Sequence, residues 1–159
     1  MKISIALCTY NGSKYLTQQL ESLKKQTIKA DEVIVCDDCS TDDTIEILEK
    51  YKDILNIKLF VNDSILGVTK NFEKAISLCS GDIIFLCDQD DIWESDKIEK
   101  MSKIFDDKNI GVVLCNGLVI DKNDKKIKNY TLWNSFGIDK IDRENFTVND
   151  LIDKNLFTG

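Results

Sequence analysis

Two groups of carboxylates stand out in this sequence because each group follows directly on an apolar run. Asp37 and Asp38 follow the run V-I-V-C, while Asp88, Asp90 and Asp91 belong to the segment D-Q-D-D that follows I-I-F-L-C. A single Asp pair is usually part of a solvated loop. Two groups at the ends of neighbouring parallel strands would instead meet at one edge of a sheet, where open α/β sheets bind their ligands.

A divalent cation is the expected partner of these carboxylates. Two carboxylates about 4 Å apart repel by about 4 kcal/mol at an effective dielectric constant of about 20, so a positive charge must offset that cost. Arg143 is the one arginine of the chain, which excludes a cluster of guanidinium groups. Oxygen ligands favour Mg²⁺ or Mn²⁺ over zinc or copper. The spacing of Asp88 and Asp90 predicts two metal ligands on one side of an extended segment, with Asp91 pointing away.

Polar side chains after the first apolar run complete a pocket suited to a nucleotide. Thr9, Tyr10 and Asn11 precede a predicted helix, whose N-terminal amides favour anions. Tyr10 offers a ring face for stacking, although core packing suits that ring equally well, and Asp37 or Asp38 could accept a hydrogen bond from a base. A metal would let this acidic edge hold a diphosphate. The chain lacks G-x-G-x-x-G and G-x-x-x-x-G-K-[ST], so dehydrogenases and P-loop enzymes fit poorly.

Strand and helix patterns alternate along the first two thirds of the chain. Short apolar runs predict strands that are buried on both faces, at residues 3–7, 33–36, 57–61, 83–87 and 110–115. Between them, apolar residues at helical spacing predict helices around residues 16–23, 45–51, 68–79 and 98–105. This alternation predicts an α/β fold with a mostly parallel central sheet flanked by helices.

The pattern changes after residue 115. Residues 118–120 and the stretch around Ile127 flank residues 122–124, which predicts a hairpin. Tyr130, Trp133 and Phe136 follow, residues 146–152 predict a short final helix, and the chain ends in mid-pattern. We therefore expect a single domain, 1–159, that is truncated at its C-terminus.

Composition excludes several classes of protein. The chain has 28 acidic and 21 basic residues and a formal charge of −7, which argues against a nucleic-acid partner. It has no histidine, so neither a Ser-His-Asp triad nor a histidine-bearing zinc site can form. No apolar run approaches the roughly 20 residues of a transmembrane helix. Cys36 and Cys39 form one C-x-x-C, which we interpret as a reduced structural pair in a cytoplasmic protein.

Three motifs together resemble the family 2 glycosyltransferases of GT-A fold, over nearly the whole chain. Residues 4–11 (S-I-A-L-C-T-Y-N) resemble the family's opening strand, and residues 33–42 (V-I-V-C-D-D-C-S-T-D) resemble its second-strand signature. Residues 80–82 (S-G-D) followed by 88–93 (D-Q-D-D-I-W) are similar to its D-x-D region. Residues 67–72 and the D-I-W ending look most like the bacterial rhamnosyltransferase-like branch. Cys8 departs from the family, which commonly has Pro there.

The resemblance implies a Rossmann-like donor-binding domain, with a nucleotide-binding part at 1–91 and the start of an acceptor-side region at 116–159. It implies inverting transfer of a sugar from a nucleotide-diphospho-sugar to a saccharide or lipid-linked saccharide acceptor, in bacterial surface polysaccharide synthesis at the inner membrane face. Carried over by position, the contacts with the donor fall on Thr9, Tyr10, Asp38, Lys70 and Asp88. The metal ligand falls on Asp90, and Asp91 takes a supporting role. The general base would follow a glycine that Gly159 resembles. This chain alone would then bind metal and nucleotide but transfer sugar poorly.

Two other functional classes share parts of this pattern. A phospho-receiver-like, Mg²⁺-binding regulatory module also places Asp pairs at strand ends, but it needs a Lys after a later strand, where this chain has Asn116 and Gly117. A non-catalytic nucleotide-sugar binder would share every donor-binding residue, so the sequence leaves that alternative open.

Overall fold

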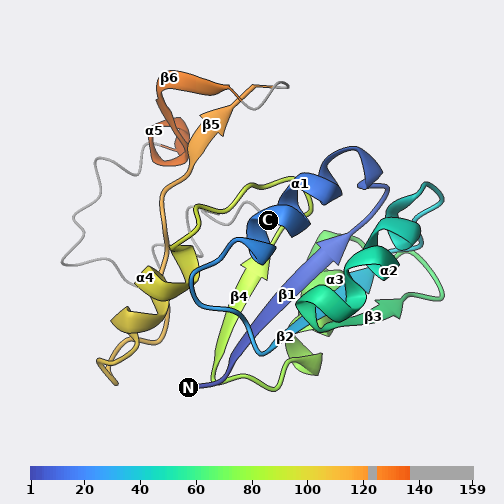
Figure 1. The fold of residues 1–159 in the computed structure, drawn as a ribbon, viewed down its shortest axis with the longest axis horizontal. Coiled ribbons are helices and arrows are strands. Elements are labelled where there is room, and N and C mark those ends of the chain that lie inside the picture. Colours follow the sequence, from blue (N-terminus) through green and yellow to red (C-terminus); the bar gives the residue numbers. More distant parts are fainter. Residues whose placement is uncertain (122–124, 137–159) are drawn as a thin grey trace. The chain divides into compact units, whose positions relative to one another are not determined.

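The structure, a computed structural model, describes residues 1–121 and 125–136. These residues belong to two compact units, Met1–Ile110 and a second that begins at Gly111. The first unit contains a four-stranded sheet and four helices, and the described part of the second contains a two-stranded sheet and one short helix (Figure 1).

The central sheet of the first unit is entirely parallel. Its strands β1 (Ile3–Thr9), β2 (Glu32–Asp37), β3 (Ile57–Val61) and β4 (Ile83–Cys87) lie in the order β3-β2-β1-β4. Every residue of β1 and β2 is buried, as expected for inner strands covered on both faces. The predicted α/β architecture and its first four strands are therefore confirmed, and the carboxyl ends of all four strands meet at one edge.

Helices cover both faces of this sheet. The larger core forms where Ile5 and Leu7 of β1 pack with α1 (Ser13–Lys24), α2 (Thr44–Leu55) and α4 (Lys97–Ile104). The alternate β1 residues Ala6 and Cys8 pack with α3 (Val68–Leu78) in a second, smaller core. This division follows from the two-residue period of a strand, which sends successive side chains to opposite faces. No helix among the described residues is both long and apolar enough to cross a membrane.

The second unit contains the predicted hairpin but not the predicted fifth strand. Strands β5 (Leu118–Ile120) and β6 (Lys126–Thr131) pair antiparallel, and α5 (Leu132–Phe136) follows them. The prediction of a strand at 110–115 is wrong, because that segment is irregular and pairs with no strand among the described residues. Apolar side chains favour a strand only where a neighbour accepts its backbone hydrogen bonds. The turn at 122–124 and the helix expected at 146–152 lie outside the described residues.

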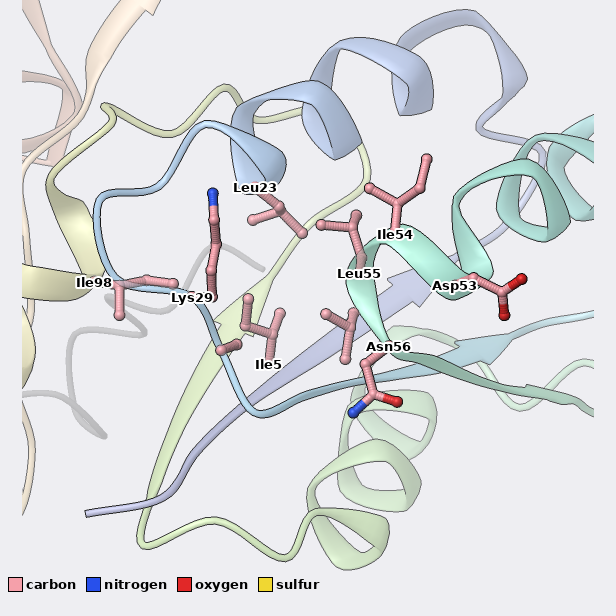
Figure 2. A pocket seen from close by; sticks show the side chains of 10 residues that line it. Ile5, Leu23, Lys29, Asp53, Ile54, Leu55, Asn56 and Ile98 are labelled. Atoms are coloured by element: carbon pink, nitrogen blue, oxygen red, sulfur yellow. The ribbon is translucent and has the colours of Figure 1, made fainter.

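A small pocket of about 160 Å³ opens near the amino ends of the strands, as Figure 2 shows. Its walls are mostly apolar side chains from the sheet, from the ends of α1 and α2, and from α4, with polar groups among them; they are Ile5, Leu23, Lys29, Ala30, Val33, Asp53, Ile54, Leu55, Asn56 and Ile98. None of the residues predicted to bind a ligand lines this pocket. It lies at the opposite end of the strands from those residues.

Candidate functional site at the carboxyl edge of the sheet

The loops that follow β1 and β2 are joined by hydrogen bonds between their polar residues. The Asn11 backbone N–H donates to Ser40 Oγ at 2.8 Å, and the Thr41 N–H donates to Asn11 Oδ1 at 2.8 Å. Asn11 has a φ of 47°, a left-handed conformation that Asn tolerates better than most residues. Asn11 and Ser40 therefore hold one loop against the other.

Asp42 extends this junction to the starts of two helices. Its carboxylate accepts hydrogen bonds from the backbone N–H groups of Ser13, at 3.0 Å, and Thr44, also at 3.0 Å. Burial would raise the pKa of Asp42, but the hydrogen bonds from Thr44 and Ser13 outweigh it and lower that pKa to about 2. Asp42 thus caps α1 and α2 together.

Asp37 and Thr9 bind each other rather than facing an open site. They stand opposite one another in the pairing of β1 with β2, and Thr9 Oγ1 donates to Asp37 Oδ2 at 2.7 Å. Ser40 donates to the same carboxylate from its backbone N–H, at 2.8 Å, and from its hydroxyl, at 2.6 Å. Both Asp37 and Thr9 are buried. In this structure the two side chains fix the second strand's loop, and their predicted contacts with a nucleotide would require these bonds to rearrange.

Asp38 is also buried, and it organises the loop that leads into α3. Asp38 Oδ1 accepts hydrogen bonds from Asn62 Nδ2, at 2.8 Å, and the Leu66 N–H, at 2.7 Å, and Oδ2 accepts one from the Gly67 N–H at 2.8 Å. Burial raises the pKa of Asp38, but these three hydrogen bonds, helped by the charge of Lys74, lower it on balance. The carboxylate is therefore ionised without a metal. Lys70, in the first turn of α3, has an exposed side chain.

The second carboxylate group lies on a turn directly after β4, which we call the acidic turn (residues 88–91). Residues 89 and 90 form a turn, so the prediction of an extended segment is wrong. Burial raises the pKa of Asp88 to about 6, with further contributions from the charges of Asp91 and then Asp90. Asp91 thus acts on Asp88 more strongly than Asp90 does. Burial is also the main cause that raises the pKa of Asp91.

Lys97 is a cation of this site that the sequence did not reveal. It begins α4, and its Nζ lies 4.0 Å from the centroid of the Trp93 ring. Its charge lowers the pKa of both Asp88 and Asp91 and so opposes the effect of their burial. Trp93 is buried, and its backbone N–H donates to Ser22 Oγ of α1 at 3.1 Å, which fixes the segment that carries Lys97. Lys97 could have been identified from the sequence as a lysine at the start of a predicted helix shortly after the D-x-D-D segment.

Cys8 marks the place where the two carboxylate groups converge. Burial is the main cause that raises the pKa of the Cys8 thiol. Smaller electrostatic contributions raise it further and come, from largest to smallest, from Cys36, Asp88, Cys87 and Asp38. Asp88 follows β4 and Asp38 follows β2, and both strands pair with β1. The predicted meeting of the strand ends is therefore observed, although Asp37 and Asp38 are held by internal hydrogen bonds.

Gln89 joins the acidic turn to the loop after β1. The Tyr10 backbone N–H donates to Gln89 Oε1 at 2.9 Å, and Gln89 Nε2 donates to the Tyr10 carbonyl oxygen at 3.1 Å. The Tyr10 side chain is 47% exposed at this edge. Gln89 was not among the residues predicted to contribute to the site.

The side chains present fit a metal that is shared with a bound ligand. No group of three or more His, Cys, Asp or Glu side chains among the described residues is arranged to hold a metal by itself. Asp88 and Asp90 carry carboxylate oxygens on the acidic turn, and Mg²⁺ is typically bound by one or two carboxylates together with phosphate oxygens and water. The donor set suits Mg²⁺ or Mn²⁺ on these grounds.

Comparison with known proteins identifies the family. Residues 4–157 match the family model described as "Glycosyl transferase family 2". The chain belongs to this family. Its relatives include the poly(ribitol-phosphate) beta-N-acetylglucosaminyltransferase TarS of Staphylococcus aureus, 36% identical over 119 residues that make up 72% of this chain and 20% of TarS. They also include the dTDP-rhamnosyl transferase RfbG of Shigella flexneri, 39% identical over 100 residues, 58% of this chain and 34% of RfbG.

Solved structures of this glycosyltransferase family agree with the fold. The crystal structure of residues 1–349 of S. aureus TarS in complex with UDP-GlcNAc matches with a TM-score of 0.66 and 31% identity, over 81% of this chain and 37% of that one. The GT-A fold is thus confirmed. The chain spans about one fifth of the length of TarS.

Proposed function

We propose that this chain is the donor-binding part of an inverting glycosyltransferase that transfers a sugar from a nucleotide-diphospho-sugar to an acceptor hydroxyl. The observation that carries the proposal is the acidic turn at the carboxyl edge of the sheet. It holds Asp88, Asp90 and Asp91, and its Gln89 amide is hydrogen-bonded to the backbone of the exposed Tyr10. A family 2 relative, TarS, has been crystallised with UDP-GlcNAc, which supports a uridine nucleotide as the first donor to test.

The exposed residues of the site take distinct roles in this proposal. The ring of Tyr10 stacks on the base, because it is the exposed aromatic side chain of the β1 loop. Asp38 contacts the base, and its carboxylate is held in position by hydrogen bonds from Asn62 Nδ2 and the Gly67 N–H. Thr9, Asn11 and Asp37 shape the pocket through the loop contacts described above.

Asp90 and Asp88 would hold Mg²⁺ or Mn²⁺ against the diphosphate of the donor. Bound there, the metal supplies a Lewis acid for the charge that grows on the leaving diphosphate. Asp91 takes a supporting role by adding negative charge that attracts the cation, and Lys97 and Lys70 contribute positive charge toward the phosphates. Burial first, and then the neighbouring carboxylates, raise the pKa of Asp88, and a perturbed pKa of this kind is common at functional sites.

The acceptor and the general base belong to the acceptor-side region in this proposal. A carboxylate base must take the proton from the attacking hydroxyl. We place that base beyond residue 159, so the chain as given should bind metal and donor while transferring sugar slowly or not at all. The acceptor is a saccharide or lipid-linked saccharide of bacterial surface polysaccharide synthesis, as the relatives' activities suggest: the E. coli relative WfgD is a glucosyltransferase acting on a diphosphoundecaprenol-linked sugar.

Titration calorimetry with UDP, dTDP and GDP, each with and without Mn²⁺, tests the proposal. We expect one nucleotide to bind tightly only when Mn²⁺ is present, and Asp90→Asn to abolish that dependence. Asp53→Asn is the matched control, because Asp53 is an exposed aspartate at the opposite end of the strands. Binding that ignores Mn²⁺, or an equal loss in the Asp53 variant, would contradict the assignment.

A further inference from the structure

One side-chain amide connects the two parts of the candidate site. The Gln89 amide forms a cyclic pair of hydrogen bonds with the backbone of Tyr10, accepting at Oε1 over 2.9 Å and donating from Nε2 over 3.1 Å. The Tyr10 N–H and carbonyl oxygen are the two groups that a neighbouring β-strand would pair with. Here, beyond the end of β1 and β4, a side chain continues the pairing of the two strands.

The glycine at position 12 leaves room for this amide. A Cβ atom on Gly12 would lie 2.1 Å from Gln89 Oε1 and 2.5 Å from Gln89 Cδ, far inside any van der Waals contact. Gly12 has a φ of −98° and a ψ of 7°, a conformation open to other residues. The absence of a side chain at position 12 is therefore required by the Gln89 amide and not by the backbone.

We propose that Gln89 is a positioning residue that couples metal binding at the acidic turn to nucleotide binding at the Tyr10 loop (residues 10–12). Gln89 lies between Asp88 and Asp90, so any movement of the turn that accompanies metal binding reaches its side chain. The amide passes that movement to the backbone of Tyr10. This inference rests on the proposed function, because it assumes that the metal and the nucleotide occupy these two segments.

Few residues can replace glutamine in this arrangement. The bridge needs a donor and an acceptor side by side on one planar group, which the Asn and Gln amides supply at neutral pH without a change of protonation. Asn is one methylene shorter and falls short of Tyr10. Met has a similar length but cannot pair with the backbone, so Gln89→Met removes the two hydrogen bonds while keeping most of the volume.

The experiment compares the affinity for UDP with and without Mn²⁺ in the wild type and in Gln89→Met. In the wild type, Mn²⁺ should lower the Kd of UDP by about tenfold or more. In Gln89→Met, that ratio should fall by at least about threefold, because the metal no longer orders Tyr10. The ratio is the informative readout, since a general loss of folding weakens both affinities and leaves their ratio unchanged.

Gly12 provides an independent route to the same result. Gly12→Ala should reduce the ratio as Gln89→Met does, because the new Cβ expels the amide. In a Gln89→Ala background, Gly12→Ala should add nothing, because its steric partner is gone. Gly111→Ala is the control, since a Cβ at Gly111 meets no atom within 4 Å. Amide hydrogen exchange at Tyr10 should be faster in each Gln89 and Gly12 variant than in the wild type.

The outcomes separate the two proposals. If the wild type binds UDP in a Mn²⁺-dependent manner and Gln89→Met retains the full ratio, the coupling role of Gln89 is refuted while the proposed function stands. If the wild type shows no Mn²⁺-dependent UDP binding, the proposed function fails and the coupling fails with it. Additive effects of the Gly12 and Gln89→Ala changes would also refute the bridge.

Discussion

The charge of Asp88 should destabilise the metal-free protein, so Asp88→Asn should stabilise it at neutral pH. Burial and the charges of Asp91 and Asp90 raise the pKa of Asp88 from 3.8 to about 6. At about 1.4 kcal/mol per pKa unit the full effect is about 3 kcal/mol, and solvent screening of this partly exposed group reduces it to about 1–2 kcal/mol. The melting temperature in EDTA should rise by roughly 2–8 °C.

The pH dependence gives this prediction its sign. Because the folded protein holds the Asp88 proton more tightly than the unfolded chain, stability falls as pH rises from about 4 through about 6. The advantage of Asp88→Asn should therefore be full above about pH 7 and should shrink as the pH is lowered toward 4. Mn²⁺ in the presence of UDP should reverse the order, because a ligand at about 100 times its Kd adds about 2.7 kcal/mol to the stability of the wild type but not to that of Asp88→Asn.

Thermal unfolding in EDTA and in Mn²⁺, at several pH values, measures both effects. Asp53→Asn serves again as the control and should change neither curve by more than about 0.5 kcal/mol. If Asp88→Asn melts at or below the wild-type temperature in EDTA at neutral pH, the acidic turn carries no electrostatic strain and the reasoning is refuted.

Two further substitutions test neighbouring parts of the site. Asp42→Ala should cost about 1–2 kcal/mol by uncapping α1 and α2. Because the folded pKa of Asp42 lies below its ordinary value, that cost should be present above about pH 4 and vanish as the pH falls through about 2, which urea unfolding would show. A constant cost at every pH would contradict the capping role. Lys97→Gln should move the midpoint pH of Mn²⁺ binding upward, because Lys97 lowers the pKa of Asp88 and Asp91. Paramagnetic resonance titrations of Mn²⁺ measure it, and an unchanged midpoint would remove Lys97 from the site.

The fold of the first unit could be predicted because its strands are buried on both faces. Continuous apolar runs identified β1 to β4, and helical stripes identified the helices between them. The run at 110–115 is also apolar, but no strand of residues 1–121 or 125–136 pairs with it. The composition of a segment indicates whether it could form a strand. Whether the strand forms depends on a second segment that pairs with it, and the local sequence does not identify that segment.

The site was predictable in position but less so in detail. Topology alone brings Asp38 and Asp88 to the same edge, on either side of β1. The sequence could not show that Thr9 lies opposite Asp37 and satisfies it, because this depends on the register of β1 against β2. Gln89 escaped notice for a similar reason, since its partner is a backbone group 79 residues away.

The most direct test of the account is a crystal structure of this chain grown with UDP and Mn²⁺, with anomalous diffraction collected to locate the metal. We predict one strong manganese peak at the acidic turn, about 2.2 Å from a carboxylate oxygen of Asp90 or Asp88 and from an oxygen of the diphosphate. A manganese peak elsewhere, or a nucleotide bound away from Tyr10 and the acidic turn, would contradict the account.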